Sequence, residues 1–204
     1  GVLATRLGAR SSAKTIGILG SGIQGHLQAK LICELLGYKS VVIWGRNDEK
    51  TASLIEVLRS ELPDVDVAQA ETPSELCEKA DVIVTTTPST APLIEAEWVR
   101  PGTHIVAVGA DSPGKQEIDE QLFARAPQIF VDSPSQCIEH GETTNALQAK
   151  VIAESDLTPL GEALLNGAKP RSDDDITIAD LTGVAVQDAA IAKSVWLNME
   201  QRSK

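Results

Sequence analysis

Aromatic residues are scarce in this sequence of 204 residues, making up only 3% of it. We therefore expect a core of aliphatic side chains, for which the hydrophobic share of 42% is ample. Uninterrupted apolar runs are short, well below the roughly 20 residues that cross a bilayer, so we expect no transmembrane helix and no membrane partner. No basic and apolar leader opens the chain, so we also expect no secretory signal.

Basic residues are also scarce relative to acidic ones. Lys and Arg number 18 against 29 Asp and Glu, which gives a formal net charge of −11. So acidic a surface repels phosphate backbones, and we expect no nucleic-acid partner. The three cysteines, Cys33, Cys77 and Cys137, are too widely spaced for paired metal ligands and odd in number for a disulfide framework. We expect no bound metal and a reducing, cytoplasmic location.

Short apolar runs alternate with amphipathic stretches, which is typical of an α/β protein with a parallel sheet. The pattern predicts a Rossmann-like, doubly wound parallel sheet with helices on both faces, followed by a C-terminal helical return. The expected strands span residues 15–19, 40–44, 65–67, 81–85, 104–108, 129–131 and 176–179. The main helices are expected after residue 22, near 47, at 73 and from about 184.

A glycine-rich turn follows the first expected strand. Its residues match G-x-G-x-x-G and are Gly20, Ser21, Gly22, Ile23, Gln24 and Gly25. The motif lies between a strand and a helix, the context in which the glycines allow a tight turn, close approach of a pyrophosphate and close helix–strand packing. The helix N-terminus then offers its N–H groups to phosphates. A glycine-rich turn without a ligand is the alternative interpretation.

The end of the second strand indicates which dinucleotide is bound. NAD-binding proteins place Asp or Glu there to bind the ribose 2′-OH, whereas this sequence has Gly45, Arg46 and Asn47. A glycine leaves space, and an arginine suits a 2′-phosphate. We therefore favour NADP(H) over NAD(H), with Arg46 and Asn47 as binding residues. The alternative is that Arg46 is an ordinary solvated loop residue.

Two further segments follow buried strands and should lie at the same edge of the sheet. The first, Thr85–Ser89, includes Thr87, whose hydroxyl can bond a phosphate or a ribose, although threonine also simply favours strands. The second, Val108–Glu117, contains Asp111 and Lys115. A carboxylate partly desolvated there by a cofactor ring is expected to have a raised pKa and to move protons. The alternative is a loop in which Asp111 caps a turn and Lys115 is solvated.

Three segments together resemble the ornithine cyclodeaminase/mu-crystallin family. They are Gly20–Gln24, Gly102–Lys115 and Asp180–Asp188, in that order, and the likeness runs from Gly1 to the C-terminal helix. The resemblance implies cofactor-binding roles for the glycine loop, Thr87, Val108, Gly109, Lys115 and Thr182. It implies contact with the substrate for Gly183 and a catalytic role for Asp111. Family members of the reductase or hormone-binding type usually lack that aspartate.

The resemblance implies an NAD(P)-dependent, ornithine cyclodeaminase-like enzyme that acts on a small amino acid. A hydride would leave and return, ammonia would be lost and a ring would close. The alternatives are an NADPH-dependent ketimine or imine reductase that takes a cyclic imine, and a non-enzymatic mu-crystallin-like binder of cofactor and ligand. Gly45 and Arg46 depart from the NAD-using cyclodeaminases and resemble the NADPH-using reductases.

The family's first third has no counterpart in the sequence. We therefore expect residues 1–12 to be a helix remaining from a preceding domain and residues 13–150 to form the dinucleotide-binding domain. Residues 151–204 would form a strand and helix that pack back on the absent substrate-binding and dimerisation domain. The resemblance also implies that the intact protein is a homodimer.

Overall fold

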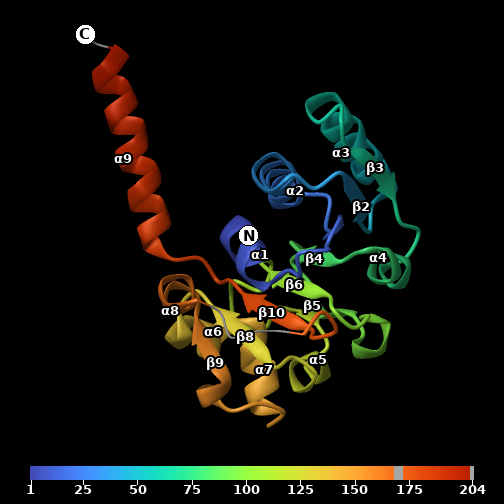
Figure 1. Ribbon diagram of the computed structural model, residues 1–204, viewed down its shortest axis with the longest axis vertical. Coiled ribbons are helices and arrows are strands. Elements are labelled where there is room, and N and C mark those ends of the chain that lie inside the picture. The colour runs from blue at the N-terminus through green and yellow to red at the C-terminus, as the bar shows by residue number, and fades with distance from the viewer. Residues whose placement is uncertain (168–171, 203–204) are drawn as a thin grey trace.

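Eight parallel strands form the central sheet of the computed structural model, which describes residues 1–167 and 172–202. Their spatial order is β3-β2-β1-β4-β6-β10-β8-β9 (Figure 1). The bounds are β1 Thr15–Leu19, β2 Ser40–Trp44, β3 Asp66–Gln69, β4 Val82–Thr85, β6 His104–Ala107, β8 Gln128–Val131, β9 Leu157–Pro159 and β10 Thr177–Asp180. The expected Rossmann-like class is therefore confirmed, and the order of strands reverses between β1 and β4.

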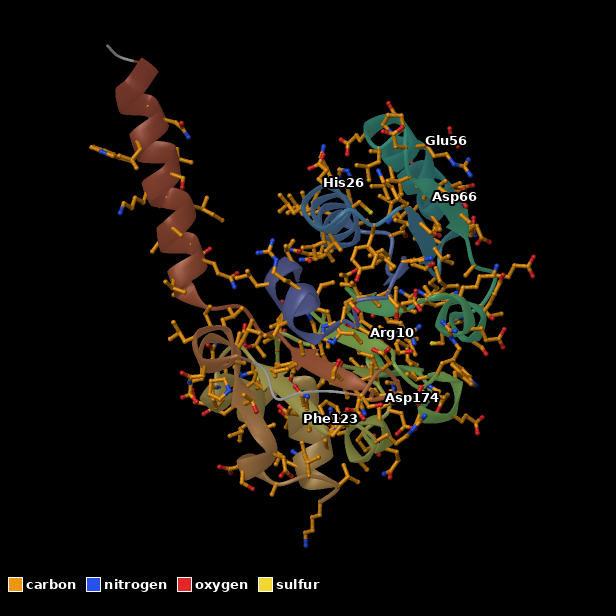
Figure 2. All side chains as sticks on the ribbon, viewed as in Figure 1. Arg10, His26, Glu56, Asp66, Phe123 and Asp174 are labelled. Carbon is orange, nitrogen blue, oxygen red and sulfur yellow. The ribbon has the colours of Figure 1, made fainter. Side chains whose placement is uncertain are left out.

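Helices cover both faces of this sheet (Figure 1). One buried cluster joins the sheet to α1 (Val2–Gly8), α2 (Ile23–Leu36), α3 (Asp48–Glu61) and α8 (Leu160–Asn166). A second cluster joins it to α4 (Pro73–Lys79), α5 (Gln121–Ala124) and α7 (Glu142–Gln148). The remaining short helix, α6, spans Pro134–His140. The core is aliphatic as expected, with Phe123 (Figure 2) and Phe130 as its buried phenylalanines.

Local signals in the sequence explain where the two longest helices of the body begin and end. Helix α2 begins after Gly22 and ends at Gly37, whose φ of 79° is left-handed and whose N–H donates to Cys33 O over 2.9 Å. Helix α3 begins after Asn47, whose side chain accepts a hydrogen bond from Lys50 N at 2.8 Å. It ends just before Leu62, and Pro63 follows.

A small second sheet was not expected from the sequence. It pairs β5 (Thr90–Ile94) with β7 (Gln116–Ile118) in parallel. Strand β9 was also missed, because Leu157–Pro159 reads Leu-Thr-Pro, which is not an apolar run and contains a proline. The sheet matters for the site, since β7 lies beside the loops that follow β4 and β6.

The range expected to form a separate C-terminal segment contributes to the central sheet. Strand β10 is hydrogen bonded between β6 and β8, so one continuous sheet contains strands from both sides of residue 150. Helix α9 (Ala185–Arg202) then extends away from the body of the molecule (Figure 1). Large apolar residues are exposed along it, namely Val186, Ile191, Val195, Trp196, Leu197 and Met199. Among the described residues, no helix is long and apolar enough to cross a membrane.

Candidate functional site

The carboxyl ends of β1, β2 and β4 border a cavity of about 320 Å³. This is the edge of the sheet where the strand order reverses, which is the position at which open α/β sheets bind ligands. The lining comes from the glycine loop, the end of β2, the start of α3 and the loop after β4. Its residues are Gly20, Ser21, Gly22, Trp44, Gly45, Arg46, Asn47, Lys50, Thr86, Thr87, Pro88, Ser89 and Leu93.

The glycine loop is tightly wound against the end of β4. Gly20 has a φ of 119°, and a Cβ on it would lie 2.7 Å from Thr86 Oγ1. A Cβ on Gly25 would lie 2.2 Å from Gly20 O, so both positions require glycine. Gly22 is the N-cap of α2, and no described side chain caps that terminus. Ile23 and Gln24 are exposed beside it. The helix N-terminus is therefore open to an anion.

Two side-chain hydroxyls lie close to position 45 at the end of β2, and they would have to shift to admit a side chain there. A Cβ on Gly45 would lie 2.5 Å from Thr51 Oγ1 and 2.7 Å from Ser21 Oγ. Arg46 is exposed at the cavity wall. Asn47 also lines the cavity, but its side-chain oxygen is engaged in capping α3. Gly45 and Arg46 thus place a cation, and no carboxylate, at the end of β2.

Asp111 and Lys115 form an ion pair in the loop after β6. Lys115 Nζ lies 2.5 Å from Asp111 Oδ1, and Ser112 Oγ donates to the same oxygen at 2.8 Å. The hydrogen bond from Lys115 holds the pKa of Asp111 below its usual range, and that from Ser112 acts in the same direction. The raised pKa was expected for a carboxylate desolvated by a cofactor ring, and it stays a prediction; in the structure the hydrogen bond from Lys115 lowers the pKa of Asp111. Lys115, for which the resemblance implies cofactor binding, is here engaged by Asp111.

Thr182 and Gly183 follow β10, the neighbour of β6, and are held by Asp132. Asp132 Oδ1 accepts hydrogen bonds from Thr182 N at 3.2 Å and from Thr182 Oγ1 at 3.1 Å. Asp132 Oδ2 accepts one from Gly183 N at 2.8 Å. Leu181 N in turn donates to Ala107 O of β6, so this loop starts beside the one that carries Asp111. The structure thus brings Thr182, expected to bind cofactor, and Gly183, expected to contact substrate, to the same edge as the glycine loop.

Four acidic residues near this edge were given no role from the sequence. Asp132 is described above, and the side chains of Glu117, Glu142 and Asp180 are buried. Burial raises the pKa of all three, and that of Asp180 to about 6. The signal that could have found two of them is an acid at the end of an apolar strand, because such a residue lies at the carboxyl edge. Glu117 and Glu142 carry no such signal. Glu117 lies in β7, which is not an apolar run, and Glu142 is the first residue of α7.

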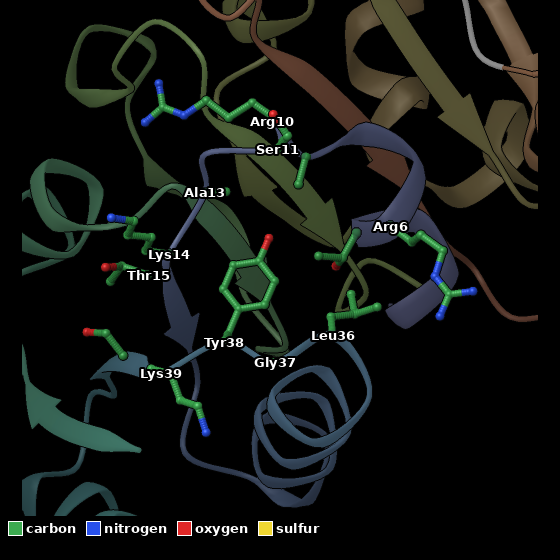
Figure 3. Close-up of a pocket in the computed structure, with 13 residues that line it drawn as sticks. Arg6, Arg10, Ser11, Ala13, Lys14, Thr15, Leu36, Gly37, Tyr38 and Lys39 are labelled. Atoms are coloured by element: carbon green, nitrogen blue, oxygen red, sulfur yellow. The ribbon is translucent and has the colours of Figure 1, made fainter. Parts of the chain in front are cut away.

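A second cavity, of about 690 Å³, lies at the opposite edge of the sheet. It is lined at the amino ends of β1 and β2, with the Tyr38 side chain extending across its centre (Figure 3). Arg6 and Lys39 point away from this centre (Figure 3), and Arg10 forms an ion pair with Asp81. None of the residues expected to bind cofactor or substrate lies there.

The model of the ornithine cyclodeaminase/mu-crystallin family matches residues 1–203. The chain belongs to this family. It is 36% identical over 200 residues to an alanine dehydrogenase of Archaeoglobus fulgidus, covering 97% of this chain and 61% of that protein. It is 34% identical over 197 residues to the ketimine reductase mu-crystallin of Mus musculus, covering 95% and 58%.

A solved structure confirms the fold of this family member. It is the iminosuccinate reductase of Paracoccus denitrificans in complex with NAD+, with a TM-score of 0.91 and 33% identity. The match covers 99% of this chain and 62% of that one. The chain therefore spans about three-fifths of the length of the relatives it matches.

Proposed function

We propose that this chain is the dinucleotide-binding part of an NAD(P)-dependent, ornithine cyclodeaminase-like enzyme acting on a small amino acid. The observation that carries the proposal is the ion pair of Asp111 with Lys115 in the loop after β6, at the edge of the sheet where the Thr182–Gly183 loop also starts. A binding protein without catalysis has no need of such a carboxylate at this place.

The cavity fits a nicotinamide dinucleotide in two respects. The open N-terminus of α2 suits the pyrophosphate, and the cation at Arg46 suits a phosphate on the adenosine ribose. When bound, the nicotinamide would supply the acceptance and return of a hydride. Thr87, Val108, Gly109, Lys115 and Thr182 would line the nicotinamide side, while Gly183 would contact the substrate.

Asp111 would move the proton in the ring closure. Its carboxylate accepts the proton that the attacking side-chain amine of the substrate loses. It then gives that proton to the α-nitrogen, which departs as ammonia with the electron pair of the broken C–N bond. No net oxidation takes place, because the hydride removed from the α-carbon is returned to it.

The test of this activity measures ammonia and the cyclic product with the intact protein and a diamino acid, without added reductant. We expect turnover with no net change in NAD(P)H. Asp111→Asn should lose turnover by about 100-fold or more while still binding dinucleotide, as expected for the loss of a general acid/base. Asp64→Asn, an exposed acid in the loop after α3, is the matched control and should be fully active. Unchanged turnover in Asp111→Asn would refute the role of Asp111.

We propose NADP(H) as the preferred cofactor. The support is the exposed Arg46 in the cavity wall, together with Gly45 at the position where NAD-binding proteins carry an acid. Calorimetric titration of the chain with NADPH and NADH tests this. Arg46→Asp should weaken NADPH about tenfold or more and NADH little, since only NADPH has the 2′-phosphate. Arg6→Asp makes the same charge change on α1 and is the control. Equal affinities in the unaltered chain would contradict the proposal.

A reductase is the second candidate function. The same Gly45–Arg46 pair supports it, because this pair resembles the pattern of the NADPH-using reductases of the family. A cyclic ketimine would then consume NADPH in a one-to-one ratio. Such consumption, with no ammonia from any diamino acid, would favour the reductase over the cyclodeaminase.

We also propose that the intact protein is a homodimer. The support is the family resemblance together with the apolar residues exposed along α9. Light scattering of the intact protein after size-exclusion chromatography measures its mass directly, and a monomer at all concentrations would overturn the proposal.

A further inference from the structure

The parallel pairing of β4 with β6 ends just before the loops that carry Thr87 and Gly109. Its last residue pair is Thr85 with Ala107, and Val108 N donates to Thr85 O at 3.0 Å. Beyond this pair the two strands continue as the loops that carry Thr87 and Gly109, with no further ladder pair between them. A dinucleotide lying across the point of reversal would place its nicotinamide half over these two loops and its adenosine half over β2.

One buried carboxylate joins the two loops where the ladder stops. Glu117 of β7 is fully buried. Its Oε1 accepts a hydrogen bond from Thr87 N at 2.5 Å, and its Oε2 accepts one from Gly109 N at 2.9 Å. Thr85 Oγ1 donates to Oε2 at 2.6 Å. Glu117 therefore accepts hydrogen bonds from both loops just beyond the last pair of the ladder.

The contact with the second loop leaves no space for a side chain. A Cβ on Gly109 would lie 2.3 Å from Glu117 Oε2 and 2.3 Å from Thr87 O. Glycine at this position is thus explained by the close approach of the carboxylate and of the neighbouring loop.

The backbone at Glu117 is itself held by a second buried carboxylate, that of Glu142. Its backbone N–H donates to Glu142 Oε1 at 2.6 Å, and Ile118 N donates to Glu142 Oε2 at 3.4 Å. Glu142 is buried at the start of α7. Since β7 cannot shift without breaking these bonds, the carboxylate of Glu117 has a fixed position between the loops.

We infer that Glu117 is a positioning residue that sets the spacing of the Thr87 and Gly109 loops and so the affinity for the nicotinamide half of the cofactor. The inference rests on the proposed dinucleotide function. It makes a specific demand, because the hydrogen bonds described for the Glu117 carboxylate go to Thr85, Thr87 and Gly109 and none goes to the glycine loop, Gly45 or Arg46. The affinity for the adenosine half should not depend on it.

The test compares whole dinucleotides with fragments that lack nicotinamide. Calorimetry measures NADPH against 2′-phospho-ADP-ribose and, in parallel, NADH against ADP-ribose. Glu117→Gln keeps the shape but places an NH2 group against Thr87 N or Gly109 N in either orientation, so one buried N–H loses its acceptor. We expect the affinity for the whole dinucleotide to fall about tenfold, with the fragment affinity unchanged. Glu120→Gln, which alters only the acid bonded to Gln116 Nε2, is the matched control.

The possible outcomes separate this inference from the proposed function. If the unaltered chain binds none of the four ligands, the proposed function fails. If it binds them and Glu117→Gln binds all as before, the inference fails and the function stands. An equal loss for dinucleotide and fragment would show a role in general stability and would also overturn the inference. Should Glu117→Gln not fold, Thr85→Val removes one donor to the carboxylate and should produce a smaller loss, again confined to the whole dinucleotide.

Discussion

Lys115 Nζ and Asp111 Oδ1 lie 2.5 Å apart, so the two residues expected to serve cofactor and chemistry are bonded to each other. The Asp111 side chain is 52% exposed and that of Lys115 is 26% exposed. The pair therefore lies within reach of ligands at the carboxyl edge. If Lys115 turns to a phosphate or ribose, Asp111 loses the hydrogen bond that keeps its pKa low and becomes a stronger base.

Removing the lysine should raise the pKa of Asp111. In Lys115→Met the largest cause of the lowered pKa is absent, so Asp111 should titrate at a higher pH than in the unaltered chain. NMR titration of the side-chain carboxyl carbon measures this directly. Lys193→Met on α9 is the control and should leave the titration where it was. A curve for Asp111 that does not move would show that the ion pair is absent in solution.

Gly109→Ala should destabilise the protein, because its Cβ meets the backbone oxygen of Thr87 as well as Glu117. Overpacking of this kind costs about 1–3 kcal/mol in the free energy of unfolding. Gly161→Ala on α8 is the control, since nothing lies within 4 Å of the added methyl there. It should be neutral or stabilising by up to about 1 kcal/mol. Urea unfolding compares the two variants, and equal stabilities would mean that the loops near Gly109 are not packed as described.

Asp132→Ala should loosen the Thr182–Gly183 loop. The carboxylate accepts hydrogen bonds from both backbone N–H groups, and alanine leaves them without that acceptor. Hydrogen exchange should therefore quicken at these two amides. Asp188→Ala, an exposed acid on α9, controls for the loss of a charge. Exchange at Thr182 and Gly183 as slow as in the unaltered chain would count against this role of Asp132.

The stability of the protein should depend on pH through Asp180. Its pKa is about 6 in the folded protein against an ordinary 3.8, so the folded form binds the proton more tightly. As pH rises through this window the unfolded chain ionises first, and the stability contributed by the protonated form is lost. Asp180→Asn does not titrate. Its stability relative to the unaltered chain should improve between pH 4 and pH 7, by up to about 3 kcal/mol.

Urea unfolding at a series of pH values measures this difference, with Asp188→Asn as the control. The wild-type and Asp180→Asn curves should approach each other, or cross, as the pH rises. A constant difference across the window would contradict a raised pKa for Asp180.

Much of the fold follows from patterns that act over short distances. The strands that were recognised, such as Ser40–Trp44, are continuous apolar runs buried on both faces, and the ends of α2 and α3 are set by Gly37 and Asn47. The glycine loop could be recognised because the spacing of its glycines, and the strand and helix on either side, are all encoded by neighbouring residues. The strands β5, β7 and β9 could not, because none of them is an apolar run, and β5 and β9 each contain a proline.

The amino-acid sequence by itself determined the class of fold, the glycine loop and the absence of an acid after β2. Each of these depends on the order of neighbouring residues and on the steric needs of the backbone. Only the tertiary structure decided that Asp111 is paired and of lowered pKa, and that Glu117 joins two loops. A pKa and a shared hydrogen bond depend on which groups the fold brings together, and Glu117 and Thr87 are 30 residues apart along the chain.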